Sequence, residues 1–401
     1  MIIHINLISH QLLPNVISTL VNWEQLHQHQ AMKVILIQGD NALADKTQTL
    51  YHFYQHLGIN DIEIQSCHTS MDYARLYQHA KNLFERLRTE YPDAMLALNA
   101  TGGTKPMSIA FTQVFDQLEQ QSMVIYTDTE HQKITILNPN ADKLPSLPYH
   151  SVLDIENYLY LNNFQLNLLI DNQSLAHEAI LARKTFSQYL LVLFEKHRGL
   201  LKMMNALCQQ TNMGHPFTPF CPNVILKSAP KDKFHDLLTA CQQQGLLTFT
   251  DIDITFSNKE SACYLGGHWL EELVYCTAID AGIEHVAMSI EGSWDNSALS
   301  STTQAENELD VVLVHNNQMM LIECKTLDWQ QHNLGQSVTL KLDSLHRKLG
   351  GSLSQGMLIS VCELGAKNQQ RIDNSRNLTS VMGSQLHQLE QQITAWRERI
   401  S

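Results

Sequence analysis

The sequence has little of what marks a secreted, membrane-spanning or zinc-ribbon protein. Its eight cysteines are scattered over 401 residues without a C-x-x-C pair, so neither a disulfide framework nor a zinc ribbon is indicated. No uninterrupted apolar run approaches the roughly 20 residues that cross a bilayer. The opening MIIHINLIS has neither a positive leader nor a cleavage site. We therefore expect a cytoplasmic protein that does not contact membranes.

Positive charge is also scarce. The chain has 27 Lys and Arg against 40 Asp and Glu, a formal net charge of −13, which argues against a protein that coats nucleic acid through a basic surface. Its 20 histidines include no H-E-x-x-H spacing. An enzyme acting on a polyanion remains compatible with this composition, because it needs only local cations and carboxylates whose charge a metal ion offsets.

Residues 1–140 alternate between two kinds of pattern. Short apolar runs at 2–8, 33–38, 62–67, 95–100 and 123–128 are typical of strands, and helical patterns at 13–27, 42–57, 71–90 and 105–121 lie between them. Such alternation predicts a doubly wound, Rossmann-like parallel sheet covered on both faces. A last run at 133–138 predicts a hairpin that closes one edge.

The rest of the chain is expected to form two further parts. Residues 138–151 are rich in proline and small polar residues and indicate a linker. Within 141–258 we expect a strand at 159–169, helices at 190–207 and 233–247, and a hairpin at 247–257, a winged-helix-like order. Residues 259–401 predict a C-terminal α/β domain, whose last helix places Leu386, Leu389, Ile393 and Trp396 on one face.

A glycine pair follows the fourth predicted strand in the stretch NATGGTKPMS. Gly102 and Gly103 permit positive φ and close backbone approach, and Lys105 adds a cation at the start of a helix whose amides can face an anion. Neither the G-x-x-x-x-G-K-[ST] nor the G-x-G-x-x-G loop is present. A tight strand-to-helix turn would use the same glycines, so spacing alone leaves both interpretations open.

A second group of polar residues lies in NELDVVLVHNNQMMLIECKT. Asp310 opens an apolar strand, HNNQ forms a turn, and Glu323 and Lys325 share one face of the returning strand. Two carboxylates on neighbouring strands can hold Mg²⁺ or Mn²⁺. Lys325 could then orient or deprotonate a water, or stabilise charge on a phosphate. An exposed hairpin with a cross-strand ion pair would give the same spacing.

The first of these patterns resembles the signature of CRISPR-associated Rossmann-fold (CARF) sensors, which bind cyclic oligoadenylate across a homodimer. The resemblance covers about the first 140 residues and includes the loop after the first strand, SHQ. It implies a homodimer with one ligand on the two-fold axis, and it favours cyclic tetra-adenylate. The ligand contacts that it implies are Ser9, Gln11, Asn99, Thr101, Gly102, Gly103, Thr104 and Lys105.

The second pattern resembles the PD-(D/E)xK motif of restriction-endonuclease-like domains, with Asp310, Glu323 and Lys325 as catalytic residues. In that family the first helix donates a glutamate to the metal, and LGGHWLEELVY offers Glu271 or Glu272. The W-L-E form of the motif favours Glu271. The implied ligands of Mg²⁺ or Mn²⁺ are then Asp310, Glu323, Glu271 and the backbone carbonyl of Cys324.

Together the two patterns resemble the CARF effector nucleases. The resemblance implies a metal-dependent endonuclease that cleaves single-stranded DNA or RNA, or nicks duplex DNA, when cyclic tetra-adenylate signals phage infection. Three alternatives stay open: a CARF-type regulator that binds DNA through the middle module, a sensor that degrades its own activator, and a restriction or repair nuclease without a second messenger. The polar stretch 291–305 has no assigned role.

Overall fold

The computed structural model describes residues 1–26, 32–67, 71–129, 131–139, 147, 149–215, 217–294, 307–326, 329 and 335–400. The chain divides into two compact units. Unit 1 comprises Met1–Gln165 together with Trp294 and Ile400, and unit 2 comprises Leu166–Ser293 and the described residues of Ser301–Arg399. Within the described residues, no helix is both long enough and apolar enough to span a bilayer.

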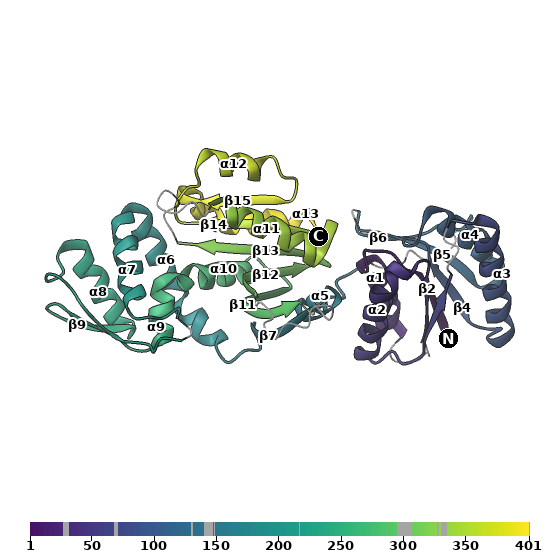
Figure 1. Ribbon diagram of the computed structural model, residues 1–401, viewed down its shortest axis with the longest axis horizontal. Helices are drawn as coiled ribbons and strands as arrows, with labels where there is room; N and C mark the ends of the chain where they lie inside the picture. The colour runs from purple at the N-terminus through teal and green to yellow at the C-terminus, as the bar shows by residue number, and fades with distance from the viewer. Residues whose placement is uncertain are drawn as a thin grey trace. The chain divides into compact units, whose positions relative to one another are not determined.

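Unit 1 is a six-stranded sheet in the order β3-β2-β1-β4-β5-β6 (Figure 1). The strands are β1 (Ile2–Leu7), β2 (Met32–Gln38), β3 (Ile62–Ser66), β4 (Met95–Asn99), β5 (Ser122–Asp128) and β6 (Lys133–Ile136). The helices are α1 (Leu13–Leu26), α2 (Ala44–His56), α3 (Tyr73–Glu90), α4 (Lys105–Phe115) and α5 (Ile155–Leu161), with 3₁₀ turns η1 (Asn41–Leu43) and η2 (Leu118–Gln120). The first five strands are parallel and β6 is antiparallel to β5, which confirms the predicted doubly wound sheet and its closing hairpin.

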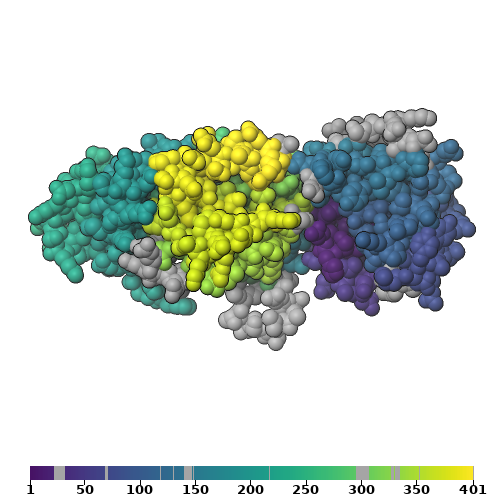
Figure 2. Space-filling view, turned by 90° about the horizontal axis from the view of Figure 1, so that it is seen from above, coloured from purple at the N-terminus to yellow at the C-terminus, as the bar shows by residue number. Residues whose placement is uncertain are grey.

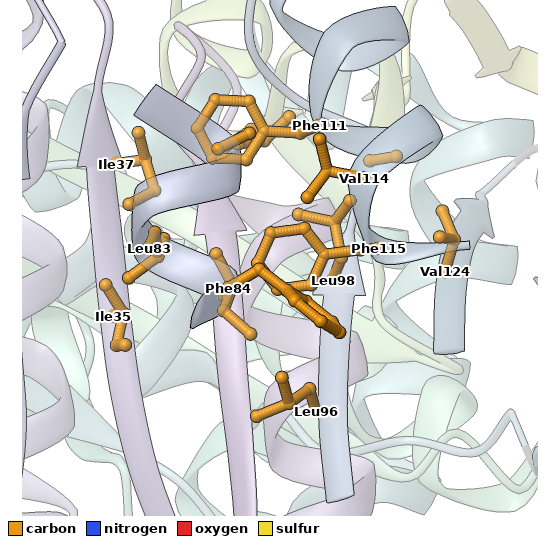
Figure 3. Close-up of a cluster of buried hydrophobic side chains, with 14 of the residues drawn as sticks. Ile35, Ile37, Leu83, Phe84, Leu96, Leu98, Phe111, Val114, Phe115 and Val124 are labelled. Atoms are coloured by element: carbon orange, nitrogen blue, oxygen red, sulfur yellow. The ribbon is translucent and has the colours of Figure 1, made fainter. Parts of the chain in front are cut away.

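One buried cluster of unit 1 lies between this sheet and the helices α3 and α4 (Figure 3). Phe84 of α3 meets Phe115 of α4 edge-to-face, with ring centroids 5.3 Å apart. Phe111 stacks on Phe115 at 6.3 Å. These rings pack over Leu96 and Leu98 of β4, which are fully buried. Because burying such a side chain contributes about 1.5–3 kcal/mol, the cluster fixes β4 and the residues that follow it.

The strand order places the ends of β1 and β4 side by side. From β1 the sheet grows through β2 to β3 on one side, and from β4 through β5 on the other. The loops that leave the carboxyl ends of these two strands therefore diverge, and ligands of doubly wound sheets bind at such a switch point. The predicted ligand loops follow these two strands.

Unit 2 contains a second six-stranded sheet, in the order β15-β14-β13-β12-β11-β7. The strands are β7 (Phe164–Ile170), β11 (His285–Trp294), β12 (Asn307–His315), β13 (Gln318–Lys325), β14 (Ser354–Ser360) and β15 (Leu378–Met382). The helices that accompany it are α10 (Trp269–Asp280), α11 (Gly335–Gly350), α12 (Ala366–Asp373) and α13 (Leu389–Arg399), with 3₁₀ turns η5 (Gly351–Leu353) and η6 (Gly383–Gln388). Strands β11, β12 and β13 are antiparallel, whereas β13, β14 and β15 are parallel. The predicted C-terminal α/β domain is thus confirmed, and the predicted stripe of the last helix is buried.

The middle of the chain belongs to unit 2, where its helices and hairpin (teal) adjoin the C-terminal elements (yellow) in Figure 2. It consists of α6 (His177–Lys196), α7 (Arg198–Gln210), α8 (Asp232–Gln243), α9 (Lys259–Cys263), the π-helical turn η4 (Tyr264–His268), and strands β8 (Asn223–Ile225), β9 (Leu247–Thr250) and β10 (Asp253–Phe256). Helix α8 is followed by the hairpin β9–β10, as predicted, and β8 adds a third strand to that hairpin.

Three expectations for this region need correction or lie outside the described residues. The strand predicted at 159–169 begins only at Phe164, because Asp154 caps helix α5 and Asn163 turns the chain at φ 56°. The helix predicted at 190–207 is divided at His197, which leaves helical geometry (φ −131°, ψ 64°). Most of the predicted linker, residues 140–146 and 148, is outside the described residues, as is the stretch 295–305 of the unassigned loop.

Candidate active site and ligand-binding turn

The predicted carboxylate hairpin is formed by β12 and β13. A two-residue turn joins the strands, and both of its residues, Asn316 and Asn317, have positive φ (47° and 62°), as a type I′ turn requires. The resulting register pairs Val311 with Ile322. One step further along the same register, Asp310 meets the segment that carries Glu323 and Lys325.

The Lys325 ammonium lies at the centre of this group. Its Nζ is 3.1 Å from Asp310 Oδ2, 2.8 Å from Glu323 Oε1 and 2.9 Å from the Cys324 carbonyl. The Cys324 amide also donates to Asp310 Oδ2 at 2.7 Å. The structure thus brings together Asp310, Glu323, Lys325 and the Cys324 carbonyl, all named from the sequence.

The charge state of Lys325 follows from these neighbours. Burial alone would lower its pKa, but the carboxylates of Asp310 and Glu323 outweigh burial, and the pKa of Lys325 is raised. The side chain is therefore an ammonium at neutral pH in this arrangement. It can donate to an anionic oxygen, but it cannot accept a proton from water.

The two adjacent glutamates of α10 have different surroundings. Glu272 pairs with Arg183 of α6, whose Nη2 is 2.5 Å from Oε1 and whose Nε is 3.0 Å from Oε2. Glu271 is buried, and its Oε2 finds no hydrogen-bond partner among the described residues. Burial first, then the nearby charges of Asp310 and Glu308, raise the pKa of Glu271 well above its ordinary value. Glu271 is therefore the α10 glutamate that faces the acidic cluster.

Two further acidic residues extend this cluster along the sheet. Glu308 of β12 is exposed and lies directly across from Glu291 of β11 in the antiparallel register. Like charges placed opposite each other on a sheet are unfavourable unless a cation screens them. Glu308 lies two positions before Asp310 on the same face, so the sequence already indicated that it could substitute as a metal ligand, whereas nothing in the sequence pointed to Glu291.

The chemistry of the donors fits a hard divalent cation. Carboxylate oxygens are what Mg²⁺ and Mn²⁺ prefer, and the unpartnered oxygen of Glu271 is an acceptor that a cation would satisfy. Across the part of the chain that the structure describes, however, no three His, Cys, Asp or Glu side chains already form a metal-binding arrangement. At the acidic cluster the space between Asp310 and Glu323 is taken by the Lys325 ammonium, so a bound ion would require Lys325 to move aside.

The predicted glycine turn packs against the end of β1. A Cβ on Gly102 would lie 1.9 Å from the carbonyl oxygen of Leu7, so no larger residue fits without moving β1. Gly103 has φ 77°, which L side chains rarely adopt. The same Cβ on Gly102 would be 3.5 Å from Ser9 Oγ. The glycine turn therefore lies against the end of β1, and the close approach to the Leu7 carbonyl is what requires a glycine at position 102.

Two residues of the turn face inward. Asn99 is fully buried; its Nδ2 donates to the Pro14 carbonyl at 3.0 Å and to Ser18 Oγ at 2.8 Å, and its Oδ1 accepts from the Thr101 amide at 3.1 Å. Thr101 Oγ1 accepts from the Thr127 amide at 2.8 Å. In this geometry Asn99 joins the start of α1 to the glycine turn, a role that nothing in the sequence pattern indicated.

The other predicted contacts lie toward solvent. Lys105 is exposed at the first position of α4, and Thr104 caps that helix by accepting from the Met107 amide at 3.4 Å. Ser9 Oγ donates to the Gln11 carbonyl at 2.9 Å, and the Gln11 side chain is exposed. A helix N-terminus with an exposed lysine favours an anionic ligand at this edge of the sheet.

Both sites fall within regions that match known families. Residues 3–158, which include the glycine turn, match the Card1 CARF domain. Residues 258–400, which include the acidic cluster, match the Card1-like endonuclease domain. The chain therefore combines a CARF domain with a Card1-like endonuclease domain. This result confirms the resemblance drawn from the two motifs.

Solved structures share the fold of this chain along nearly its full length. Protein VC1899 from Vibrio cholerae is 20% identical, with a TM-score of 0.79 over 100% of this chain and 98% of that one. Can2 from Sulfobacillus thermosulfidooxidans, in complex with cyclic tetra-adenylate, is 21% identical, with a TM-score of 0.72 over 98% and 97%. A type III CRISPR defence DNA nuclease activated by cyclic oligoadenylate is 14% identical, with a TM-score of 0.51 over 94% of this chain and 47% of that one. Among curated proteins, none matches this chain.

Proposed function

We propose that this chain is a metal-dependent endonuclease of CRISPR antiviral defence, which cleaves single-stranded DNA or RNA, and nicks duplex DNA, when cyclic tetra-adenylate binds its CARF domain. The observation that carries the proposal is the cluster of Asp310, Glu323 and Glu271 around Lys325, within a domain of the endonuclease family. These residue types at one site are what phosphodiester hydrolysis needs.

Each side chain of the cluster has a role in this proposal. Asp310, Glu323, Glu271 and the Cys324 carbonyl would hold Mg²⁺ or Mn²⁺. Such an ion supplies a polarised phosphate and a water of lowered pKa. Lys325, kept protonated by its neighbours, donates to a non-bridging oxygen of the scissile phosphate and stabilises the charge that develops there. The Cys324 amide holds Asp310 in place.

The activator site is the switch point between β1 and β4. Lys105 and the amides at the start of α4 would face phosphates, and Ser9, Gln11 and Thr104 would complete the polar surface. A cyclic ligand with internal rotational symmetry suits an isologous homodimer, because each copy of the turn then meets an equivalent phosphate. Can2, which shares this fold, was solved with cyclic tetra-adenylate bound.

A cleavage assay with matched activators tests the proposal. Purified protein with Mn²⁺ or Mg²⁺ is incubated with labelled single-stranded DNA, RNA and duplex DNA, with and without each cyclic oligoadenylate. We expect cleavage that requires cyclic tetra-adenylate and is lost in Glu323→Ala and on addition of a chelator. Cleavage without any activator would instead favour a nuclease with no second messenger, and loss of the activator itself would favour a sensor that degrades it.

A further inference from the structure

Glu323 has a second cationic neighbour besides Lys325. Lys341 of α11 places its Nζ 3.7 Å from Glu323 Oε2, while Lys325 lies 2.8 Å from Oε1. The two lysines therefore approach different oxygens of one carboxylate. Lys341 follows Glu323 by 18 positions and belongs to a helix, so the D-x(n)-E-x-K motif does not include it.

The two lysines differ in how tightly they are held. The Lys325 side chain is 23% exposed and has three oxygens within 3.1 Å, from Asp310, Glu323 and Cys324. The Lys341 side chain is 45% exposed and its ion pair with Glu323 is longer. The Glu323 side chain is only 6% exposed, so the half-exposed Lys341 ammonium can leave this longer ion pair when a metal ion takes over the neutralisation of that carboxylate.

Nucleic acid that approaches this site meets an unfavourable field. Glu271, Glu308, Asp310 and Glu323 form an acidic group around one partly buried ammonium, and the chain as a whole has a net charge of −13. A phosphate near the cluster therefore needs a cation that is both adjacent and accessible. Lys341 meets both requirements.

We infer that Lys341 is a phosphate-binding residue for the cleaved strand: its ammonium leaves Glu323 and pairs with a backbone phosphate next to the scissile one. The inference rests on the proposed nuclease function and assigns a substrate contact outside the motif. In the absence of substrate, Lys341 neutralises part of the charge on Glu323. When Glu323 takes up its role at the metal, Lys341 is released toward the phosphate.

The test is the salt dependence of substrate binding. Each phosphate contact to a single strand contributes about 0.7 to the slope of log K against log salt. In full-length Asp310→Asn protein with cyclic tetra-adenylate and Mn²⁺, which keeps labelled single-stranded DNA or RNA uncut, adding Lys341→Ala should weaken binding and lower this slope by about 0.7. Lys341→Arg should restore the slope, because arginine also pairs with phosphate.

Arg347→Ala is the matched control. It removes the same charge from the same helix, but Arg347 pairs with Asp343 at 3.0 Å and is 64% exposed. We expect its slope to equal that of the parent protein. A second readout uses protein that keeps Asp310. In single-turnover cleavage, the protein concentration that gives half of the maximal rate is measured over the same salt range, and its dependence on salt should fall in Lys341→Ala as the salt slope of binding does.

Two failures of this test are distinguishable. If the unaltered protein cleaves its substrate and Lys341→Ala lowers the cleavage rate without changing the salt slope, Lys341 only positions Glu323, and the phosphate contact is wrong. If the unaltered protein cleaves none of the substrates with any activator, the proposed function itself fails.

Discussion

The two sites of this chain treat buried polar groups in opposite ways. At the glycine turn, Asn99 is fully buried but neutral, and both ends of its amide are hydrogen-bonded. At the acidic cluster, Glu271 is almost as buried, yet within the described residues its Oε2 has no partner and its neighbours carry like charge. The first site is organised before any ligand binds, whereas the second holds electrostatic repulsion that a cation would relieve.

The largest effect is expected for a substitution at the acidic cluster that impairs cleavage but leaves activator binding unchanged. Asp310→Asn should lower activator-dependent cleavage at least about 1,000-fold, equivalent to about 4 kcal/mol of transition-state stabilisation, because it removes one charge from the proposed metal site. Affinity for cyclic tetra-adenylate, measured by calorimetry, should not change. Lys105→Ala should do the reverse, with weaker activator binding but full cleavage at saturating activator. Residual cleavage within tenfold of the unaltered protein would remove Asp310 from the catalytic group.

The two units should also respond to acid in opposite directions. In unit 1, burial lowers the pKa of His4 from 6.5 to about 4. The unfolded chain then binds a proton that the folded unit excludes, so the stability of unit 1 is complete above pH 6.5 and falls as the pH drops toward 4, by about 3 kcal/mol. Amide hydrogen exchange of β1 and β2 in the full chain measures this loss. His4→Gln should abolish the loss of stability between pH 6.5 and 4. If the stability of the His4→Gln protein fell with pH as before, other groups would cause the loss.

Glu271 provides the opposite case in unit 2. Its raised pKa means that the folded unit retains a proton that the unfolded chain releases, so without metal this group destabilises unit 2 as the pH rises above about 4.5. Glu271→Gln should therefore stabilise metal-free unit 2 at pH 7.5, because glutamine has no proton to release as the pH rises.

The same substitution should cost function. Glu271→Gln should reduce Mn²⁺ affinity and cleavage, so that stability and activity change in opposite directions. Glu272→Gln is the matched control at the next position, and it should destabilise unit 2 because Arg183 loses its bidentate partner. If Glu271→Gln destabilised unit 2 without metal, this would show that Asp310 and Glu308 do not repel the Glu271 carboxylate in the folded protein.

Features that depend on local pattern were predictable from the sequence. Strand and helix periods gave the parallel sheet of unit 1, and the spacing from Asp310 to Lys325 gave the hairpin, because a two-residue turn fixes the register of both strands. The family matches confirm the fold and the recognised family. The domain boundaries at 140 and 258 and the individual site residues stay predictions.

Features that depend on how elements dock were not predictable. Neighbouring residues of a helix point about 100° apart, so the helical period alone could not choose between Glu271 and Glu272. The W-L-E form of the family motif favoured Glu271, and the docking of α10 agrees with it. Gly102 is required by the Leu7 carbonyl, which is distant in sequence. Lys341 reaches Glu323 only because α11 packs beside β13. The strand β7 joins a sheet whose next strand begins more than a hundred residues later.

The smallest effect is expected for Asn99→Ala, which tests whether Asn99 acts on the ligand directly or by organising the turn. Asn99→Ala removes three hydrogen bonds that connect Pro14, Ser18 and Thr101, so we expect the amides of the turn and of the first turn of α1 to exchange faster even without ligand. The looser turn should weaken cyclic tetra-adenylate binding by about 1–2 kcal/mol, roughly 5- to 30-fold, since ordering it then costs part of the binding free energy. Lys105→Ala, at an exposed position, should weaken binding without altering exchange in the free protein. If Asn99→Ala behaved like Lys105→Ala, Asn99 would contact the ligand as the sequence suggested, and the glycine turn would be as dependent on its ligand as the acidic cluster is on its cation.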